Sequence, residues 1–171
     1  KSLKGISADR IVAMGIAQVP EGRGIFGSLT VRENLKLATW QRKDKNEIAK
    51  DYDKVFGIFP RLKERINQAG GTLSGGEQQM LAMARVLVGA PRLLLIDEPT
   101  EGLAPKIVDE IFTLMEGLRR DGIPILLVEQ NMHRAIGLVQ RFYVLERGAI
   151  VLEGDGGNTA HREALVRQLA V

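Results

Sequence analysis

Cysteine is absent from the 171 residues of this chain, which excludes disulfides and thiolate metal sites. No apolar run approaches the roughly 20 residues that a membrane-spanning helix needs, and residues 1–10 are polar, without the apolar core of a signal peptide. The net charge is only +3 and the basic residues are scattered, so we expect no nucleic-acid partner. We therefore expect a globular domain that does not cross a membrane itself but can dock on a protein that does.

A phosphate-binding motif is also missing. The pattern GxxxxGK(S/T), whose backbone amides and lysine hold nucleotide phosphates, occurs nowhere in the chain. The segment Gly22–Gly27 does match the GxGxxG spelling of a dinucleotide-binding loop. That fingerprint requires a helix that opens within the motif and a βαβ unit around it. Here the next helix signal begins at Thr30 and the next strand pattern at Leu93, so we reject a dinucleotide site.

What the chain does contain is a helix start that suits an anion. Ser74 and Glu77 have the spacing of a capping box, in which each side chain satisfies a backbone amide at the start of a helix. Gly75 and Gly76 between them let the backbone approach a ligand. A helix N-terminus offers free N–H groups and a partial positive charge, so a phosphate is the natural ligand. Capping boxes are also common without any ligand, so the motif alone does not establish a site.

Two carboxylates follow an apolar run shortly after this helix. Leu93–Ile96 predicts a strand buried on both faces, as in a parallel sheet covered by helices. Ligands of such sheets bind at the carboxyl ends of the strands. There Asp97 can ligate Mg²⁺ and Glu98 can orient or deprotonate an attacking water, although a strand can also simply end at two solvated acids. Gln130 lies just beyond a second apolar run, residues 125–128, which also predicts a buried strand.

The remaining periodicity predicts an α/β protein whose second half alternates strands and helices. We expect strands at residues 16–19, 93–96, 125–128, 142–146 and 150–153, and helices at residues 7–14, 30–40, 44–56, 74–89, 105–119, 132–139 and 159–169. No strand pattern occurs between residues 28 and 71, so this stretch is interpreted as a helical insertion. The helix that begins at Ser74 is expected to bury Met80, Leu81, Ala84, Leu87 and Val88.

These motifs resemble those of a known family. LSGGEQQMLAMARVL, residues 73–87, is similar to the signature helix of ABC transporter ATP-binding subunits, and LLLIDEP, residues 93–99, resembles their Walker B strand. The similarity runs from about Ile16 to Val171. It implies a P-loop-NTPase-like (RecA-like) layered sheet lobe, residues 1–27 and 91–171, that is incomplete at its N-terminus. It also implies an inserted helical subdomain, residues 28–90, and an ATPase that uses ATP and Mg²⁺.

The resemblance assigns roles to single residues. It implies catalytic roles for Glu98, Gln130 and Glu21, and a Mg²⁺ ligand at Asp97 with Glu21 as a further candidate. It implies that ATP held by one subunit is contacted by a short segment of the other, namely Ser74, Gly75, Gly76 and Glu77. The D-loop corresponds to Glu101, Gly102, Leu103 and Ala104.

Three positions depart from the wider family. Glu21 stands where most members have glutamine, Gln130 where they have histidine, and Ala104 where the D-loop has aspartate. The first two departures are also features of the branch of this family that the next paragraph describes. They leave the contact with the γ-phosphate to Gln130, a neutral donor that cannot gain a proton near neutral pH.

Four segments narrow the resemblance to the branched-chain amino-acid importer branch, with a related urea or amide importer subunit as the alternative. They are VPEGRGIF, LTVRENL, DEPTEGLAP and LLVEQN. The implied partners are transmembrane permease subunits docked on the helical subdomain, a second ATP-binding subunit in a homo- or heterodimer, and indirectly a periplasmic or extracellular solute-binding protein. The implied location is peripheral, on the cytoplasmic face of the plasma (inner) membrane.

The missing P-loop motif leaves other interpretations open. The resemblance implies an N-terminal portion before Lys1, so we expect the polypeptide as printed to bind ATP weakly or not at all, and its exposed sheet edge to favour self-association. A non-catalytic truncated fragment that keeps the fold and the partner contacts is therefore an alternative to the active ATPase. An ABC ATPase without a membrane partner, as in DNA repair or translation, is less well supported because long insertions and a second cassette are absent.

Overall fold

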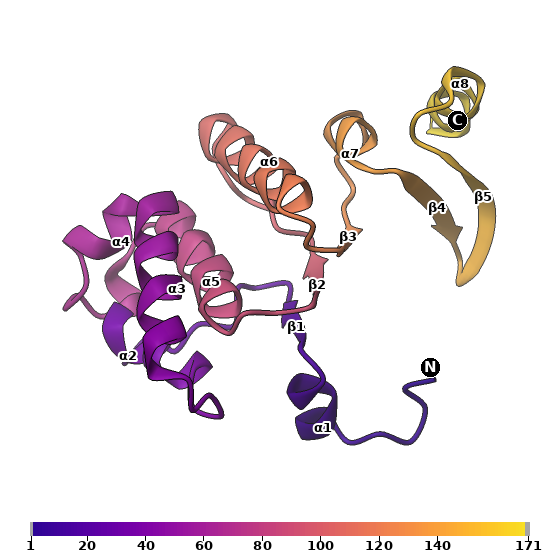
Figure 1. Ribbon diagram of the computed structural model, residues 1–171. Coiled ribbons are helices and arrows are strands. Elements are labelled where there is room, and N and C mark those ends of the chain that lie inside the picture. The colour runs from indigo at the N-terminus through magenta and orange to yellow at the C-terminus, as the bar shows by residue number, and fades with distance from the viewer. Residues whose placement is uncertain (1, 170–171) are drawn as a thin grey trace. The chain divides into compact units, whose positions relative to one another are not determined.

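The computed structural model describes residues 2–169, so Lys1 and residues 170–171, which the sequence interpretation places in the α/β lobe, lie outside the described part. The chain divides into two compact units, Lys1–Glu129 and Gln130–Val171 (Figure 1). The helices are α1 (Ala8–Ala13), α2 (Val31–Ala38), α3 (Lys45–Ile58), α4 (Pro60–Glu64), α5 (Gly75–Val88), α6 (Pro105–Arg120), α7 (Met132–Leu138) and α8 (Thr159–Leu169), with a 3-10 turn at Gly70–Thr72. The strands are β1 (Ile16–Val19), β2 (Leu93–Asp97), β3 (Ile125–Val128), β4 (Arg141–Glu146) and β5 (Ala149–Asp155). Within residues 2–169, no helix has the length and apolarity to span a bilayer.

The first unit is built on a parallel sheet in the order β1-β2-β3. Val19 lies opposite Ile96, and Asp97 lies opposite Val128. The three strands therefore end at the same edge of the sheet, which confirms the expected layered α/β arrangement for this part of the chain.

The expected burial of these strands on both faces is wrong. In β2, Leu94 and Ile96 are buried, but Leu93 and Leu95 on the other face are only partly covered. In β3, Leu126 and Val128 are 59% and 53% exposed. Strand β3 lies at one side of the sheet, and the described residues cover only one of its faces. An apolar run indicates a hydrophobic strand, but it does not indicate whether one face or both faces of that strand are covered.

Helix α5 is the centre of the core. It packs against α2, α3, α4 and β1, which surround it in Figure 1. Burial of Leu81, Ala84, Leu87 and Val88 confirms most of the predicted core face. Met80 is a wrong prediction, because it is partly exposed in a groove between the α3–α4 segment and α6. The residues buried in addition are Gln79, Ala82 and Met83.

The stretch between β1 and α5 is helical, as expected. Its helices are α2, α3 and α4, and its β-type pairing among the described residues is an isolated bridge between Thr30 and Ala69. Trp40 lies just beyond the end of α2 with 83% of its surface exposed. The boundaries of a separate helical subdomain, residues 28–90, remain a prediction.

The second unit contains an antiparallel hairpin and two helices. Strands β4 and β5 are joined by Arg147 and Gly148, at φ 49° and 80°, which confirms the predicted turn. Helix α8 packs against β5. The hairpin leaves Tyr143, Leu145 and Ile150 exposed.

Candidate functional site

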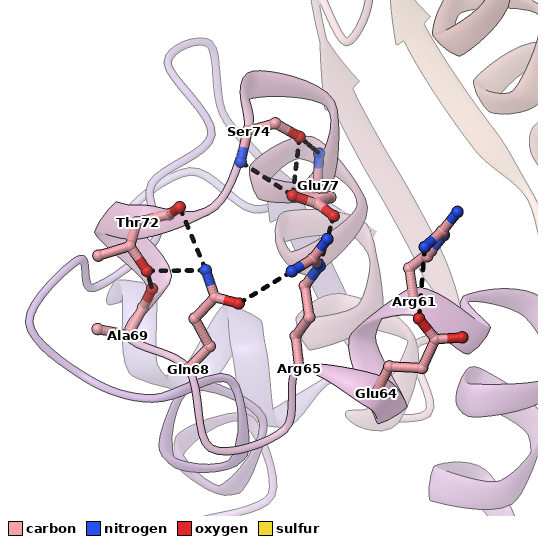
Figure 2. Close-up of polar contacts among 8 residues, drawn as sticks. All are labelled: Arg61, Glu64, Arg65, Gln68, Ala69, Thr72, Ser74 and Glu77. Carbon is pink, nitrogen blue, oxygen red and sulfur yellow. Dashed lines mark hydrogen bonds and ion pairs between the residues drawn. The ribbon is translucent and has the colours of Figure 1, made fainter.

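Helix α5 begins with the predicted capping box. Ser74 is the N-cap residue, and its Oγ accepts a hydrogen bond from the Glu77 N–H at 3.3 Å. Glu77 Oε2 accepts one from the Ser74 N–H at 3.0 Å, and the Ser74 hydroxyl donates to the same oxygen at 2.9 Å (Figure 2). The capping box orders the first turn of the helix, which fixes the direction of its free amides.

Two of those amides are left open. Among the described residues, the N–H groups of Gly75 and Gly76 have no hydrogen-bond acceptor, whereas those of Glu77 and Gln78 bond to Ser74. Ser74 itself is exposed, so the N-terminus of α5 faces solvent. Two adjacent amides that point outward from a capped helix are suited to an anion.

Both glycines are closely packed against side chains of this chain. A Cβ on Gly75 would lie 3.1 Å from Nη2 of Arg23, and one on Gly76 would lie 3.1 Å from two side-chain carbons of Ile107. The sequence interpretation explained the glycines by close approach of a ligand. The structure supplies a second reason, which is close packing against Arg23 on one side and the first turn of α6 on the other.

A network of polar side chains braces the turn before α5. Arg65 Nε lies 2.7 Å from Glu77 Oε1, and Arg65 Nη1 donates to Gln68 Oε1 at 3.2 Å (Figure 2). Gln68 Nε2 in turn donates to the Thr72 hydroxyl at 2.9 Å. Partial burial raises the pKa of Glu77, but the hydrogen bonds from Ser74 and the charge of Arg65 outweigh it and lower the pKa overall. Glu77 is thus held as a carboxylate beneath the open amides.

The glycine-rich loop after β1 contacts the same helix. Gly22, Arg23 and Gly24 have φ values of 71°, 71° and 59°. Arg23 Nη1 donates to Gln78 Oε1 at 2.7 Å. Helix α2 begins only at Val31, which agrees with the rejection of a dinucleotide-binding loop.

Further contacts hold this loop, and sequence reasoning missed all of them. Arg85 Nη1 donates to the Gly24 carbonyl, and the guanidinium carbon lies 4.9 Å from the centre of the Phe26 ring. Burial lowers the pKa of Arg85. Asn34 is fully buried, and its amide nitrogen donates to the carbonyls of Phe26, Leu29 and Thr30 while its oxygen accepts from the Phe26 N–H. No local pattern marks an asparagine that will be buried, so the sequence offers no signal for this clamp.

The end of β2 places two carboxylates in succession. Asp97 is the last residue of the strand, and Glu98 follows with φ 41° while its N–H donates to the Val128 carbonyl at 2.9 Å. A left-handed conformation at a residue other than glycine costs about 1–3 kcal/mol, and residues strained in this way cluster at functional sites. Next to it, buried Thr100 donates to Glu129 Oε2 at 2.8 Å, which joins the ends of β2 and β3.

The other predicted site residues are more dispersed. Glu21 is exposed two residues after β1, at the edge of the sheet where Asp97 lies. The D-loop segment runs from the end of β2 to α6, and its Glu101, Gly102 and Ala104 are exposed while Leu103 is partly covered. Gln130 is the first residue of the second unit.

The donor set is compatible with Mg²⁺ only in part. Across residues 2–169 there is no group of three or more histidine, cysteine, aspartate or glutamate side chains placed to hold a metal ion. Mg²⁺ commonly takes one or two protein carboxylates and completes its coordination with water and substrate phosphates. Asp97 fits that habit as one carboxylate on a rigid strand end.

Comparison with known proteins assigns the family. The family model described as ABC transporter matches residues 3–101. The chain is 50% identical to the high-affinity branched-chain amino acid transport ATP-binding protein BraG of Pseudomonas aeruginosa, over 91% of this chain and 66% of that protein. It is 41% identical to a probable branched-chain amino acid transport ATP-binding protein, LivF, of Archaeoglobus fulgidus, over 88% of this chain and 64% of that protein.

The solved structures agree on the fold. One described as a nucleotide-free ATP-binding cassette from an ABC transporter superposes with a TM-score of 0.78 at 22% identity, over 98% of this chain and 70% of that one. The chain spans about two thirds of the length of the curated relatives it matches. By the family model and by its identity to these relatives, this chain belongs to the ABC transporter family.

Proposed function

We propose that this chain is part of the ATP-hydrolysing subunit of an importer for branched-chain amino acids. The observation that carries the proposal is the succession of Asp97 and Glu98 at the carboxyl end of β2, with Glu98 in a strained conformation. The similarity to two branched-chain amino acid transport proteins supports the choice of solute.

The carboxylates at the end of β2 serve the nucleotide held by this subunit. Asp97 would hold Mg²⁺, with Glu21 as a further candidate ligand, and the bound ion would supply positive charge that stabilises the phosphates. Glu98 orients the attacking water and accepts its proton. Gln130 donates a hydrogen bond to the γ-phosphate and keeps the same charge throughout the physiological pH range.

The N-terminus of α5 serves the nucleotide held by a second ATP-binding subunit. The open amides of Gly75 and Gly76 and the hydroxyl of Ser74 bind its terminal phosphate, and Glu77 holds the turn in place. The D-loop residues, Glu101, Gly102, Leu103 and Ala104, lie in the contact between the two subunits.

The helical segment docks on the permease. Trp40, with 83% of its surface exposed, is the kind of side chain that a protein interface buries. The complex then sits peripherally on the cytoplasmic face of the plasma membrane, and a solute-binding protein acts on the other side. ATP-driven closure of the two subunits is passed through this contact to the permease.

The test is turnover by the complete subunit carrying Glu98→Gln. We expect ATP binding to persist and hydrolysis to fall by about a hundredfold or more, because the general base is lost. Glu110→Gln, an exposed carboxylate on α6, is the matched control and should hydrolyse ATP at the wild-type rate. Steady hydrolysis by Glu98→Gln above a few per cent of wild type would contradict the assignment.

The solute is tested in reconstituted vesicles. Hydrolysis should rise when the complex meets its binding protein loaded with leucine, isoleucine or valine. Stimulation by urea or short amides alone would instead assign the subunit to the related urea branch.

A further inference from the structure

Arg23 is held in a conformation that arginine avoids. Its φ is 71°, and the Gly24 N–H donates to the Gly22 carbonyl at 2.8 Å, which closes a three-residue turn around it. This γ-turn with positive φ is rare and strained, and glycine would adopt it without difficulty. An arginine at this position, between two glycines, indicates that its side chain has a structural or functional role.

The side chain ends at the first turn of α5. Nη1 donates to Gln78 Oε1 at 2.7 Å, and Nη2 lies over the Cα of Gly75, where a Cβ would be 3.1 Å away. Gln78 also contacts the turn that precedes Ser74, because its side-chain amide donates to the Gly70 carbonyl at 3.3 Å. One guanidinium therefore touches the helix start and, through Gln78, the segment leading into it.

The loop that carries Arg23 follows β1, and Glu21 lies in it two residues before Arg23. From Gly24 onward the loop has two further contacts, because Arg85 of α5 donates to the Gly24 carbonyl and Asn34 holds Phe26. Arg85 lies in the last turn of α5, whereas Arg23 reaches the first turn, so Arg23 is the side chain that links the loop to the open amides. Those amides and Glu21 belong to different nucleotide sites in the proposed function.

We propose that Arg23 is a positioning residue that couples the loop after Glu21 to the N-terminus of α5. A shift of Glu21 when this subunit binds its own ATP moves the strained turn, and Arg23 transmits the shift to Gly75 and Gln78. The subunit then presents Ser74–Gly76 to its partner only when its own site is filled. This inference rests on the proposed function for its consequence, but the linkage itself is testable without it.

The test replaces Arg23 by glycine in the complete subunit. Glycine suits the φ of 71°, so the variant should fold, and only the guanidinium contacts are lost. Arg147→Gly is the matched control, since Arg147 also has positive φ but its side chain is 93% exposed in the hairpin turn. We expect amide hydrogen exchange of residues 74–78 to rise about tenfold in Arg23→Gly and to stay unchanged in Arg147→Gly.

The second readout is ATP-driven pairing of subunits in a Glu98→Gln background. Arg23→Gly should bind ATP with wild-type affinity yet need about tenfold more ATP to pair, and Arg23→Lys should fall between because lysine lacks the fork geometry. Gln78→Ala should reproduce the defect, and the double variant should be no worse than either single one.

Two outcomes separate the inference from the proposed function. Equal exchange at residues 74–78 and equal pairing in Arg23→Gly and Arg147→Gly would overturn the coupling. If the Glu98→Gln subunit with Arg23 intact does not pair at any ATP concentration, the proposed function fails, and the exchange comparison still decides whether Arg23 orders the start of α5.

Discussion

Helices α2 and α5 begin with the same capping box, yet their first turns end up in opposite situations. At α2, Thr30 and Glu33 cap the helix. The N–H groups of the first two helical residues, Val31 and Arg32, donate to the backbone carbonyls of Gln68 and Ile66. At α5 the corresponding two amides have no acceptor among the described residues. The cap fixes where a helix starts, but a neighbouring segment decides whether its N-terminus is closed by the chain or open to a ligand.

The residues after each cap agree with this difference. Val31 and Asn34 in α2 are fully buried, so its first turn belongs to the core. The first turn of α5 has two glycines and lies beside the cations Arg23 and Arg65. The first capping box is structural, and the second is suited to bind an anion.

The largest effect is expected at the buried clamp beside the first box. Asn34→Ala removes four hydrogen bonds and leaves the Phe26 N–H without its acceptor, while the carbonyls of Phe26 and Leu29 each keep one backbone donor. We expect a loss of about 3 kcal/mol in the free energy of unfolding, measured by urea denaturation. Asn67→Ala is the control, because Asn67 is exposed and should change stability by less than about 0.5 kcal/mol. Equal losses would mean that Asn34 does not hold the loop.

Removing the N-cap side chains of α2 and α5 should affect stability equally but subunit pairing differently. Thr30→Ala and Ser74→Ala should each lower the free energy of unfolding by about 1 kcal/mol, because each removes one N-cap acceptor. Only Ser74→Ala should also weaken ATP-driven pairing of complete subunits, measured by gel filtration in a Glu98→Gln background. Ser74→Arg should block pairing outright while nucleotide binding persists. Weakened pairing by Thr30→Ala of the same size would remove the distinction between the two boxes.

A smaller effect is expected from the pH dependence of the stability that Glu77 contributes at the start of α5. The pKa of Glu77 is lowered in the folded chain, so its stabilisation is present above the ordinary value near 4.5 and is lost as pH falls through the lower folded value. The stability gap between wild type and Glu77→Gln should therefore shrink as pH falls from about 5 to about 3, by less than about 1 kcal/mol. Arg65→Ala should move that loss to higher pH. A stability difference between wild type and Glu77→Gln that widens as the pH falls would contradict the lowered pKa of Glu77.

The smallest effect is expected at the glycine that touches Arg23. Gly75→Ala gains helix propensity but crowds Nη2 of Arg23, a flexible side-chain end that can move away. We expect a net change within about 0.5 kcal/mol by thermal denaturation. Destabilisation well above that range would show that Arg23 cannot shift and that the contact is rigid.

What the sequence predicted correctly is mostly local. A capping box joins residues three apart, and the hairpin turn joins neighbours, so Ser74 with Glu77 and Arg147 with Gly148 could be identified directly. The order of strands and helices followed from the periodicity for the same reason. The order α2 to α5, with no strand between residues 28 and 71, was also correct.

What the sequence missed depends on distant partners. Arg23 and Gln78 are 55 positions apart, and nothing near either residue indicates the pairing. The exposure of Leu126 and Val128 depends on which layers cover β3, and the partial exposure of Met80 depends on a groove between separate helices. The strained φ of Glu98 depends on its hydrogen bond to Val128, which a neighbouring strand supplies.

Trp40 is the single tryptophan in the sequence, and its place beyond α2 gives the molecule a built-in optical reporter. Because the indole is 83% exposed, its emission should lie toward the red and be readily quenched by iodide. All tryptophan fluorescence of the printed sequence therefore comes from Trp40, just beyond the end of α2. A blue shift on reconstitution with a tryptophan-free permease would locate the covered surface without any label.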